Sequence, residues 1–201
     1  MTITGLTYER IGRAEEVVRR LDALACVYQE VYAEPPYREG PRDAADFRVR
    51  AGRQAVRDGF RLVLARDGDE LVGFSYGYRL PPDTGWWRAL EEPLDDAFVE
   101  EDGRRTFNVA ELAVRGPWRR QGVAAALHRL LIADQEAERI TLTVRPDPEA
   151  APARTAYATW GYRKVGRARY GDSHPAYDVM VLPLPLPDGA PARLRRCGNR
   201  P

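Results

Sequence analysis

A short basic turn between a strand-like run and a helix is the part of the sequence best suited to hold a phosphate group. The run 107–114 (FNVAELAV) predicts a strand, and the helix after it opens with Gly122 and Ala124 in its first turn. The first backbone N–H groups of a helix lack intrahelical partners, and the helix dipole adds about half a positive charge there. Small side chains leave this backbone open, so the turn predicts a pyrophosphate site. The arginines that add positive charge around it are Arg115, Arg119 and Arg120.

The spacing excludes the two best-known phosphate loops. A Walker A loop needs Gly-Lys-Ser/Thr, and GxGxxG needs three glycines where this turn has only Gly122. The turn fits Arg/Gln-x-x-Gly-x-Gly/Ala as Arg119-x-x-Gly122-x-Ala124, and in this it resembles the GNAT N-acetyltransferase superfamily. In that family the turn holds the pyrophosphate of acetyl-CoA at the start of a central helix. The resemblance implies acetyl-CoA as the co-substrate, bound by Leu112, Ala113, Val114, Arg119, Arg120, Gln121, Gly122, Val123 and Ala124.

The flanking sequence extends the resemblance over residues 6–184. The stretch 153–162 (ARTAYATWGY) is similar to the family's helix that ends in Tyr-x-x-x-Gly-Phe, and Val72-Gly73-Phe74 matches its early hairpin. The resemblance implies an α/β fold, a GNAT-like mixed, centrally splayed β-sheet of about six to seven strands flanked by about four helices. It also implies one acyl-CoA-dependent N-acyltransferase domain over 1–184, followed by a Pro/Arg-rich tail over 185–201.

Hydrophobic periodicity and turn residues predict the elements that position the turn. Apolar spacings of three and four predict one helix over 14–32, which Pro35-Pro36 must end. A second helix with Phe47, Val49, Ala51 and Val56 is expected next, and 80–103 is expected to be irregular. The other expected helices are 122–137 and 153–160. The expected strands are 3–11, 60–66, 71–79, 107–114, 140–144, 162–167 and 177–184.

Acetyl transfer to an amine needs a deprotonated nitrogen, donors for the developing oxyanion and a proton for the leaving thiolate. The resemblance implies that a backbone N–H near Leu112 or Val114 polarises the thioester carbonyl. Tyr157, five residues before Tyr162, stands where the family has its catalytic acid; alternatively, it only packs and binds the CoA sulfur. Strand alternation places Glu111 on the face opposite Leu112, as a base or as a partner of the substrate amine or of an arginine.

Two histidines and an acid-rich stretch complete the candidates. His128 lies inside an amphipathic helix and is interpreted as structural, and His174 as a solvated loop residue. Residues 91–102 carry seven acids and no base, and they follow two tryptophans. Acids and aromatic rings suit a cationic amine, whereas the alternative is a solvated loop with tryptophans over the core. The candidate substrate residues are Trp86, Trp87, Tyr37 and Asp96.

Composition narrows the function further. The net charge of +1 gives no sign of a nucleic-acid partner, and two cysteines without a CxxC or Cys/His cluster predict no metal. The amino-terminal residues lack an apolar signal core, so we expect a cytoplasmic protein without a membrane partner, a possible homodimer. The leading hypothesis is an N-acetyltransferase that moves acetyl from acetyl-CoA to a primary amine of a small, cationic molecule in a ternary complex. The alternatives are a protein N-terminal or lysine acetyltransferase and a non-catalytic CoA-binding regulator.

Overall fold

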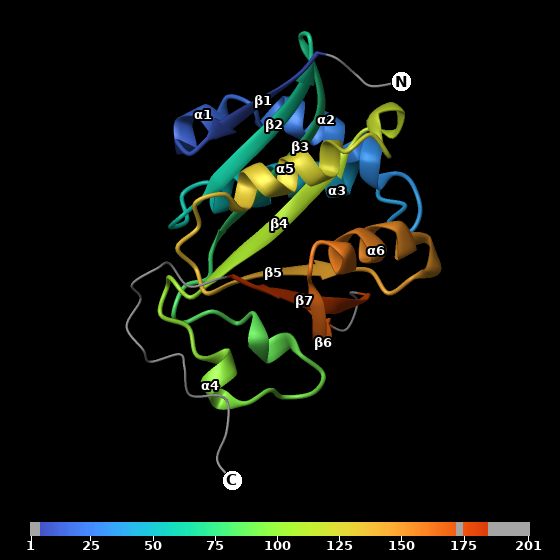
Figure 1. Ribbon diagram of the computed structural model, residues 1–201. Coiled ribbons are helices and arrows are strands. Elements are labelled where there is room, and N and C mark those ends of the chain that lie inside the picture. Colours follow the sequence, from blue (N-terminus) through green and yellow to red (C-terminus); the bar gives the residue numbers. More distant parts are fainter. Residues whose placement is uncertain (1–4, 172–174, 185–201) are drawn as a thin grey trace.

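A single mixed sheet of seven strands organises the described part of the chain (Figure 1). The computed structural model describes residues 5–171 and 175–184, so the tail over 185–201 and His174 lie outside the described residues. The strand order is β1-β2-β3-β4-β5-β7-β6, and the β4–β5 pair alone is parallel. The strands are β1 (Leu6–Ile11), β2 (Arg61–Asp67), β3 (Glu70–Arg79), β4 (Thr106–Val114), β5 (Arg139–Val144), β6 (Arg163–Arg169) and β7 (Ala176–Pro183). The predicted mixed sheet is confirmed.

Helices cover both faces of this sheet, and each face has its own apolar core. Tyr28 and Phe47 pack with Phe74 beneath the first three helices, whereas Leu127 packs with Phe107 and Ile140 under α5. Figure 1 shows α5 and α2–α3 on opposite sides of the sheet. The helices are α1 (Ala14–Val18), α2 (Leu21–Tyr32), α3 (Pro41–Gln54), α4 (Asp96–Val99), α5 (Val123–Ile132) and α6 (Ala151–Thr159).

The helices differ in detail from the expectation. The single helix predicted over 14–32 is wrong, because the backbone N–H of Arg20 turns to the carbonyl of Val17 at 2.9 Å and separates α1 from α2. The helix predicted over 122–137 ends at Ile132, because Asp134 takes a left-handed backbone conformation with φ +57°. The described residues therefore hold six α-helices, where about four were expected, and the short α4 adds to the count.

The centre of the sheet is split. Strands β4 and β5 pair over only three residues each, from Thr106 to Asn108 and from Arg139 to Thr141. Beyond these residues β4 continues to Val114 and β5 to Val144 without pairing to each other, so the two strands diverge. We call the space between their carboxyl halves the wedge. The splay expected at the centre of the sheet is confirmed.

The segment 80–105 is tied to the sheet by a buried ion pair. The guanidinium of Arg139 lies 2.8 Å from the carboxylate of Glu101, and the two side chains are 7% and 0% exposed. Arg139 also donates to the hydroxyl of Thr106 and the carbonyl of Phe98, both at 2.7 Å. It stacks on the rings of Phe98 and Trp87, at 4.3 and 4.7 Å from their centroids. This cluster fixes the otherwise irregular segment 80–105 against the start of β5. We call this segment the excursion.

Candidate active site

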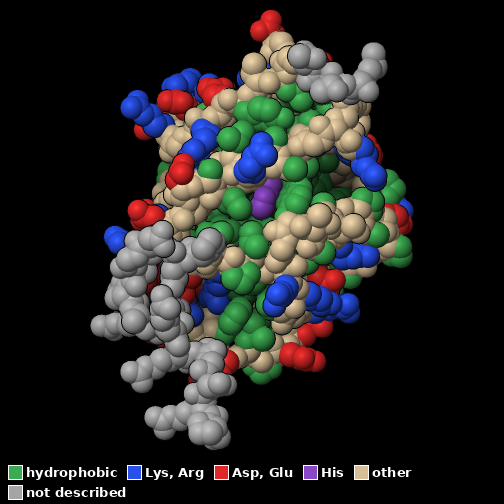
Figure 2. Space-filling model, in the orientation of Figure 1, with side chains coloured by type: hydrophobic (Ala, Val, Ile, Leu, Met, Phe, Trp, Pro, Cys, Tyr) green, Lys and Arg blue, Asp and Glu red, His purple; other side chains and the backbone are tan. Residues whose placement is uncertain are grey.

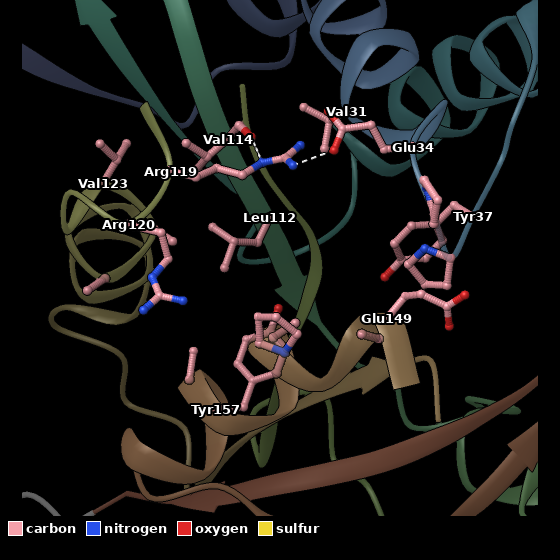
Figure 3. Close-up of a pocket in the computed structure, with 18 of the residues that line it drawn as sticks. Val31, Glu34, Tyr37, Leu112, Val114, Arg119, Arg120, Val123, Glu149 and Tyr157 are labelled. Atoms are coloured by element: carbon pink, nitrogen blue, oxygen red, sulfur yellow. Dashed lines mark hydrogen bonds and ion pairs between the residues drawn. The ribbon is translucent and has the colours of Figure 1, made fainter. Parts of the chain in front are cut away.

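A cavity of about 580 Å³ opens beside the wedge and brings together four parts of the chain (Figure 3). Leu112 contributes from β4, Tyr157 from α6, and the segments 122–125 and 34–37 contribute from the start of α5 and from the connection between α2 and α3. Figure 2 shows the molecule hollowed on the side where α5 lies, with mostly apolar side chains gathered in the hollow. The cavity thus joins the predicted phosphate turn to the predicted reacting end.

The start of α5 has the open backbone that the sequence predicts. Gly122 has φ +83°, a left-handed conformation that favours glycine, and a Cβ added there would meet no atom within 4 Å. The first bond of the helix runs from the N–H of Ala126 to the carbonyl of Gly122, at 3.0 Å. The N–H groups before it are those that a helix leaves unpaired. This part of the cavity wall therefore combines unpaired donors, open space and the positive end of the helix dipole.

The arginines of the turn do not all serve as free charge, which corrects the expectation. Arg119 donates its Nε to the carbonyl of Val114 at 2.9 Å and pairs with Glu34 at 2.5 Å. Arg115 pairs with Glu30 at 2.9 Å and Glu70 at 2.6 Å. Arg120 lines the cavity without an ion pair to any described residue.

Neighbouring side chains shape the turn around Arg120. The backbone of Arg120 is left-handed, with φ +62°. The amide of Gln121 donates to the carbonyl of Pro117 at 2.7 Å, which closes the turn on itself. Figure 3 shows Arg119 directed to Glu34, and the side chain of Arg120 extended from the start of α5. At the cavity, Arg120 thus keeps a guanidinium without an ion pair to any described residue.

Tyr157 lies in the cavity wall with its ring held edge-on. Its ring centroid is 5.5 Å from that of Trp160 and 5.7 Å from that of Tyr162. Burial raises the pKa of Tyr157 above its usual value, and the nearby charge of Glu111 raises it further. The hydroxyl is therefore protonated at neutral pH, which is the state that a proton donor needs.

Glu111 lies on the other face of β4 from Leu112, as alternation predicts, and both of its carboxylate oxygens are occupied. Arg50 donates to Oε1 at 2.7 Å and the hydroxyl of Tyr32 donates to Oε2 at 2.8 Å. The side chain is 10% exposed, and this burial raises the pKa of Glu111 even though Arg50 acts to lower it. The predicted contact with an arginine is present, and the role of base stays a proposal.

Of the four predicted substrate residues, the structure brings only Tyr37 to the cavity. Trp87 is 5% exposed and donates to Glu101 at 2.9 Å, so it belongs to the core beneath 80–105. Trp86 packs on Tyr170, with ring centroids 5.9 Å apart, and Asp96 begins the short α4. None of these three lines the cavity. Several of the seven acids have structural partners instead, because Glu101 and Asp95 bond within the excursion and Glu91 pairs with Arg169 at 3.6 Å.

Two contributors that sequence reasoning did not single out are Arg50 and Glu34. Arg50 reaches Glu111 across 61 positions of sequence, and Glu34 reaches Arg119 across 85. A local pattern carries no information on such pairs. One local feature of the sequence does point to this part of the site: Tyr28 and Tyr32 are spaced i, i+4. This spacing places both rings on one helix face, next to Phe47.

His128 is structural, as predicted, and its environment has a measurable consequence. Its Nε2 lies 2.8 Å from the hydroxyl of Tyr162 and its ring stacks on Trp160 at 4.6 Å. Burial lowers the pKa of His128 from 6.5 to about 4. The unfolded chain therefore binds a proton at His128 more tightly than the folded protein does. The contribution of neutral His128 to folding stability is complete above pH 6.5 and is lost as the pH falls through 4.

We expect His128 alone to lower the free energy of unfolding by about 3 kcal/mol between pH 7 and pH 4. Chemical denaturation at several pH values measures this change. The matched variant His128→Phe keeps a buried ring that cannot titrate, and should show a shallower loss over the same range. Equal pH dependence in both proteins would show that His128 does not contribute.

The described residues include no helix with the length and apolar character that a membrane span requires. The same residues contain no group of three or more His, Cys, Asp or Glu side chains placed to hold a metal ion.

Several solved structures of known proteins are similar to this chain along most of its length. A Corynebacterium glutamicum structure described as "histone acetyltransferase HPA2 and related acetyltransferase" is 20% identical, with a TM-score of 0.60 over 92% of this chain and 99% of that one. An aminoglycoside 6'-acetyltransferase type Ii is 19% identical, with a TM-score of 0.60 over 90% and 99%. The NatC complex bound to Gag peptide and CoA includes a chain that is 15% identical, with a TM-score of 0.57 over 90% and 100%.

These likenesses show a shared fold, and the sequence itself is matched by a family model. A search of curated proteins finds no match for the chain. The model of the acetyltransferase (GNAT) family matches residues 21–162, which include the turn, the wedge and Tyr157. The chain therefore belongs to the GNAT acetyltransferase family.

Proposed function

We propose that this protein transfers the acetyl group of acetyl-CoA to a primary amine of a small, cationic molecule, by direct attack in a ternary complex. The observation that carries the proposal is the single cavity that joins the open start of α5 to Leu112 and Tyr157 beside the wedge. A molecule with a pyrophosphate at one end and a thioester at the other fits these two ends.

The cofactor end is proposed to use backbone more than side chains. The N–H groups at 120–124 would hold the pyrophosphate, and the guanidinium of Arg120 would add charge to it. Arg119 and Gln121 shape the turn through their bonds to Val114 and Pro117. The carboxyl half of β4, 112–114, would bond the amides of the pantetheine arm, because β5 does not pair with this part of β4, although the carbonyl of Val114 already accepts from Arg119.

The reacting end supports a balanced transfer. The amine nitrogen bonds to the thioester carbon, and the carbonyl electron pair moves to oxygen, where an N–H of β4 near Leu112 or Val114 donates to it. Collapse restores the carbonyl and breaks the carbon–sulfur bond, and the thiolate takes the proton of Tyr157. The proton lost by nitrogen passes to Glu111 through Tyr32 or water and returns to Tyr157 through solvent. The products are an amide and free CoA.

Two rings and one carboxylate on and next to the segment 34–39 support a cationic acceptor, and of these Tyr37 lines the cavity. Tyr37 lines the cavity, and Tyr32 lies against it with ring centroids 4.7 Å apart. Glu39 accepts a hydrogen bond from Tyr28 at 2.5 Å and forms no ion pair with any described residue. Rings and a carboxylate together favour an ammonium-bearing acceptor. A protein N-terminus or lysine is the alternative acceptor.

The test is a thermal-shift titration with acetyl-CoA, CoA and ATP, followed by thiol release with a panel of amines and peptides. Ligand binding to the native state raises its melting temperature, and we expect CoA species to do so and ATP not to. Fastest release with a small polyamine or amino sugar supports the proposal, and fastest release with a peptide favours the alternative acceptor. Stabilisation without release on any acceptor would support a CoA-binding regulator.

A further inference from the structure

Tyr37 is a second phenol at the reacting end of the cavity. It comes from the connection between α2 and α3, whereas Tyr157 comes from α6, and both line the cavity with Leu112. Figure 3 shows Tyr37 on the side opposite Arg120 and Val123, with Leu112 between the two sides. The hydroxyl of Tyr37 has no hydrogen-bond partner among the described residues, so it is available to a ligand.

Two ion pairs connect the segment that carries Tyr37 to other elements around the cavity. Glu34, three residues before it, pairs with Arg119 at 2.5 Å, and Arg38, directly after it, pairs with Glu149 at 3.4 Å. Arg119 precedes α5 and Glu149 precedes α6, so the segment is held from both sides of the cavity. The ring of Tyr37 is also held by the edge contact with Tyr32. A side chain held at several points loses little freedom when it bonds a reacting atom.

The electrostatic surroundings keep this hydroxyl protonated. Burial raises the pKa of Tyr37 above its usual value, and the neighbouring groups Tyr157 and Glu111 raise it further. A phenol in this state donates a hydrogen bond to an atom that gains negative charge. Tyr157 is assigned to the sulfur, so the thioester oxygen is the other such atom.

We propose that Tyr37 is a catalytic residue that donates a hydrogen bond to the thioester oxygen as that oxygen gains charge, beside the N–H of β4. The proposal rests on the acetyl transfer proposed above. No proton leaves Tyr37: the carbonyl electron pair moves to oxygen when nitrogen attacks, and returns when the carbon–sulfur bond breaks. The donor therefore stabilises the intermediate and the transition states on either side of it.

The variant Tyr37→Phe removes the donor and keeps the ring. We expect kcat to fall about 100-fold, because loss of one oxyanion donor costs two to three orders of magnitude in comparable sites. The dissociation constant for CoA, measured by calorimetry, should stay within about twofold. Tyr170→Phe, an equal change on an exposed tyrosine that does not line the cavity, should leave kcat unchanged.

Two acceptors separate catalysis from substrate binding. An oxyanion donor acts on the acetyl group, so Tyr37→Phe should lower kcat by the same factor for the smallest and the largest amine that the wild-type protein accepts. A loss confined to one amine, or expressed only in its KM, would make the hydroxyl of Tyr37 a contact to the acceptor rather than to the thioester oxygen, and would overturn the proposal. A weaker CoA affinity would overturn it as well, because it would show a structural role. If the wild-type protein acetylates no acceptor, the proposed function fails and the role of Tyr37 fails with it, whereas an active wild-type protein with an equally active Tyr37→Phe variant overturns the role of Tyr37 alone.

Discussion

Replacing Gly122 with glutamate is expected to abolish the binding of acetyl-CoA. The space next to Gly122 is empty to at least 4 Å, and it lies at the unpaired start of α5. A glutamate side chain would fill this space with negative charge, where the pyrophosphate is proposed to bind. Isothermal calorimetry should show at least a 100-fold rise in the dissociation constant, since both volume and charge oppose the ligand.

Two control variants separate the causes of this loss. Gly122→Gln has the same volume without the charge, and Gly122→Ala carries the backbone strain of φ +83° alone. The affinity for CoA should be highest in the alanine variant, lower in the glutamine variant and lowest in the glutamate variant. The melting temperature should fall by a similar amount in all three variants, because they share the backbone strain. Wild-type affinity in Gly122→Glu would show that the cofactor does not bind at this turn.

Replacing Arg139 with methionine is expected to cost about 3–5 kcal/mol of unfolding free energy, the usual cost of breaking a buried ion pair from one side. The change leaves the carboxylate of Glu101, which is 0% exposed, without its cation. It also removes the donors to Thr106 and Phe98. Urea denaturation measures the loss, and part of it should appear as early opening of 80–105, detected by faster hydrogen exchange of the amides in this segment.

The double variant Arg139→Met with Glu101→Leu is the matched control. Removing both charges leaves no unpaired ion, so the double variant should be more stable than Arg139→Met alone. If the losses of unfolding free energy in Arg139→Met and in Glu101→Leu simply add in the double variant, the ion pair does not hold the excursion. Binding of CoA should persist in the double variant, because neither residue lines the cavity.

The sheet was predictable because its signals are local. The turn Asp67-Gly68-Asp69 separates two apolar runs, and the structure places β2 and β3 within one residue of the predicted ends. The break between α1 and α2 was not predictable, because Val17, Val18 and Leu21 keep a helical spacing across it. Only the folded chain shows that Val18 points to solvent, at 55% exposed.

The same difference between local and distant signals applies to the candidate site. The turn, Leu112 and Tyr157 belong to motifs of adjacent residues, and the structure brings them to one cavity. The acidic stretch misled at Glu101, whose carboxylate pairs with Arg139, which lies 38 positions away. A burial preference explains Trp87 better than a substrate contact, and composition alone does not distinguish these cases.

The wedge also bears on how this protein avoids aggregation. A sheet normally ends at its outer strands, here β1 and β6, and unpaired backbone there invites pairing with other chains. The wedge adds a third, interior edge along the carboxyl half of β4, since β5 diverges from it. This edge faces a cavity of about 580 Å³ that residues of α5 and α6 line, so another chain could reach the edge only between these two helices. The helices that border the proposed ligand site therefore also cover the interior edge of the sheet.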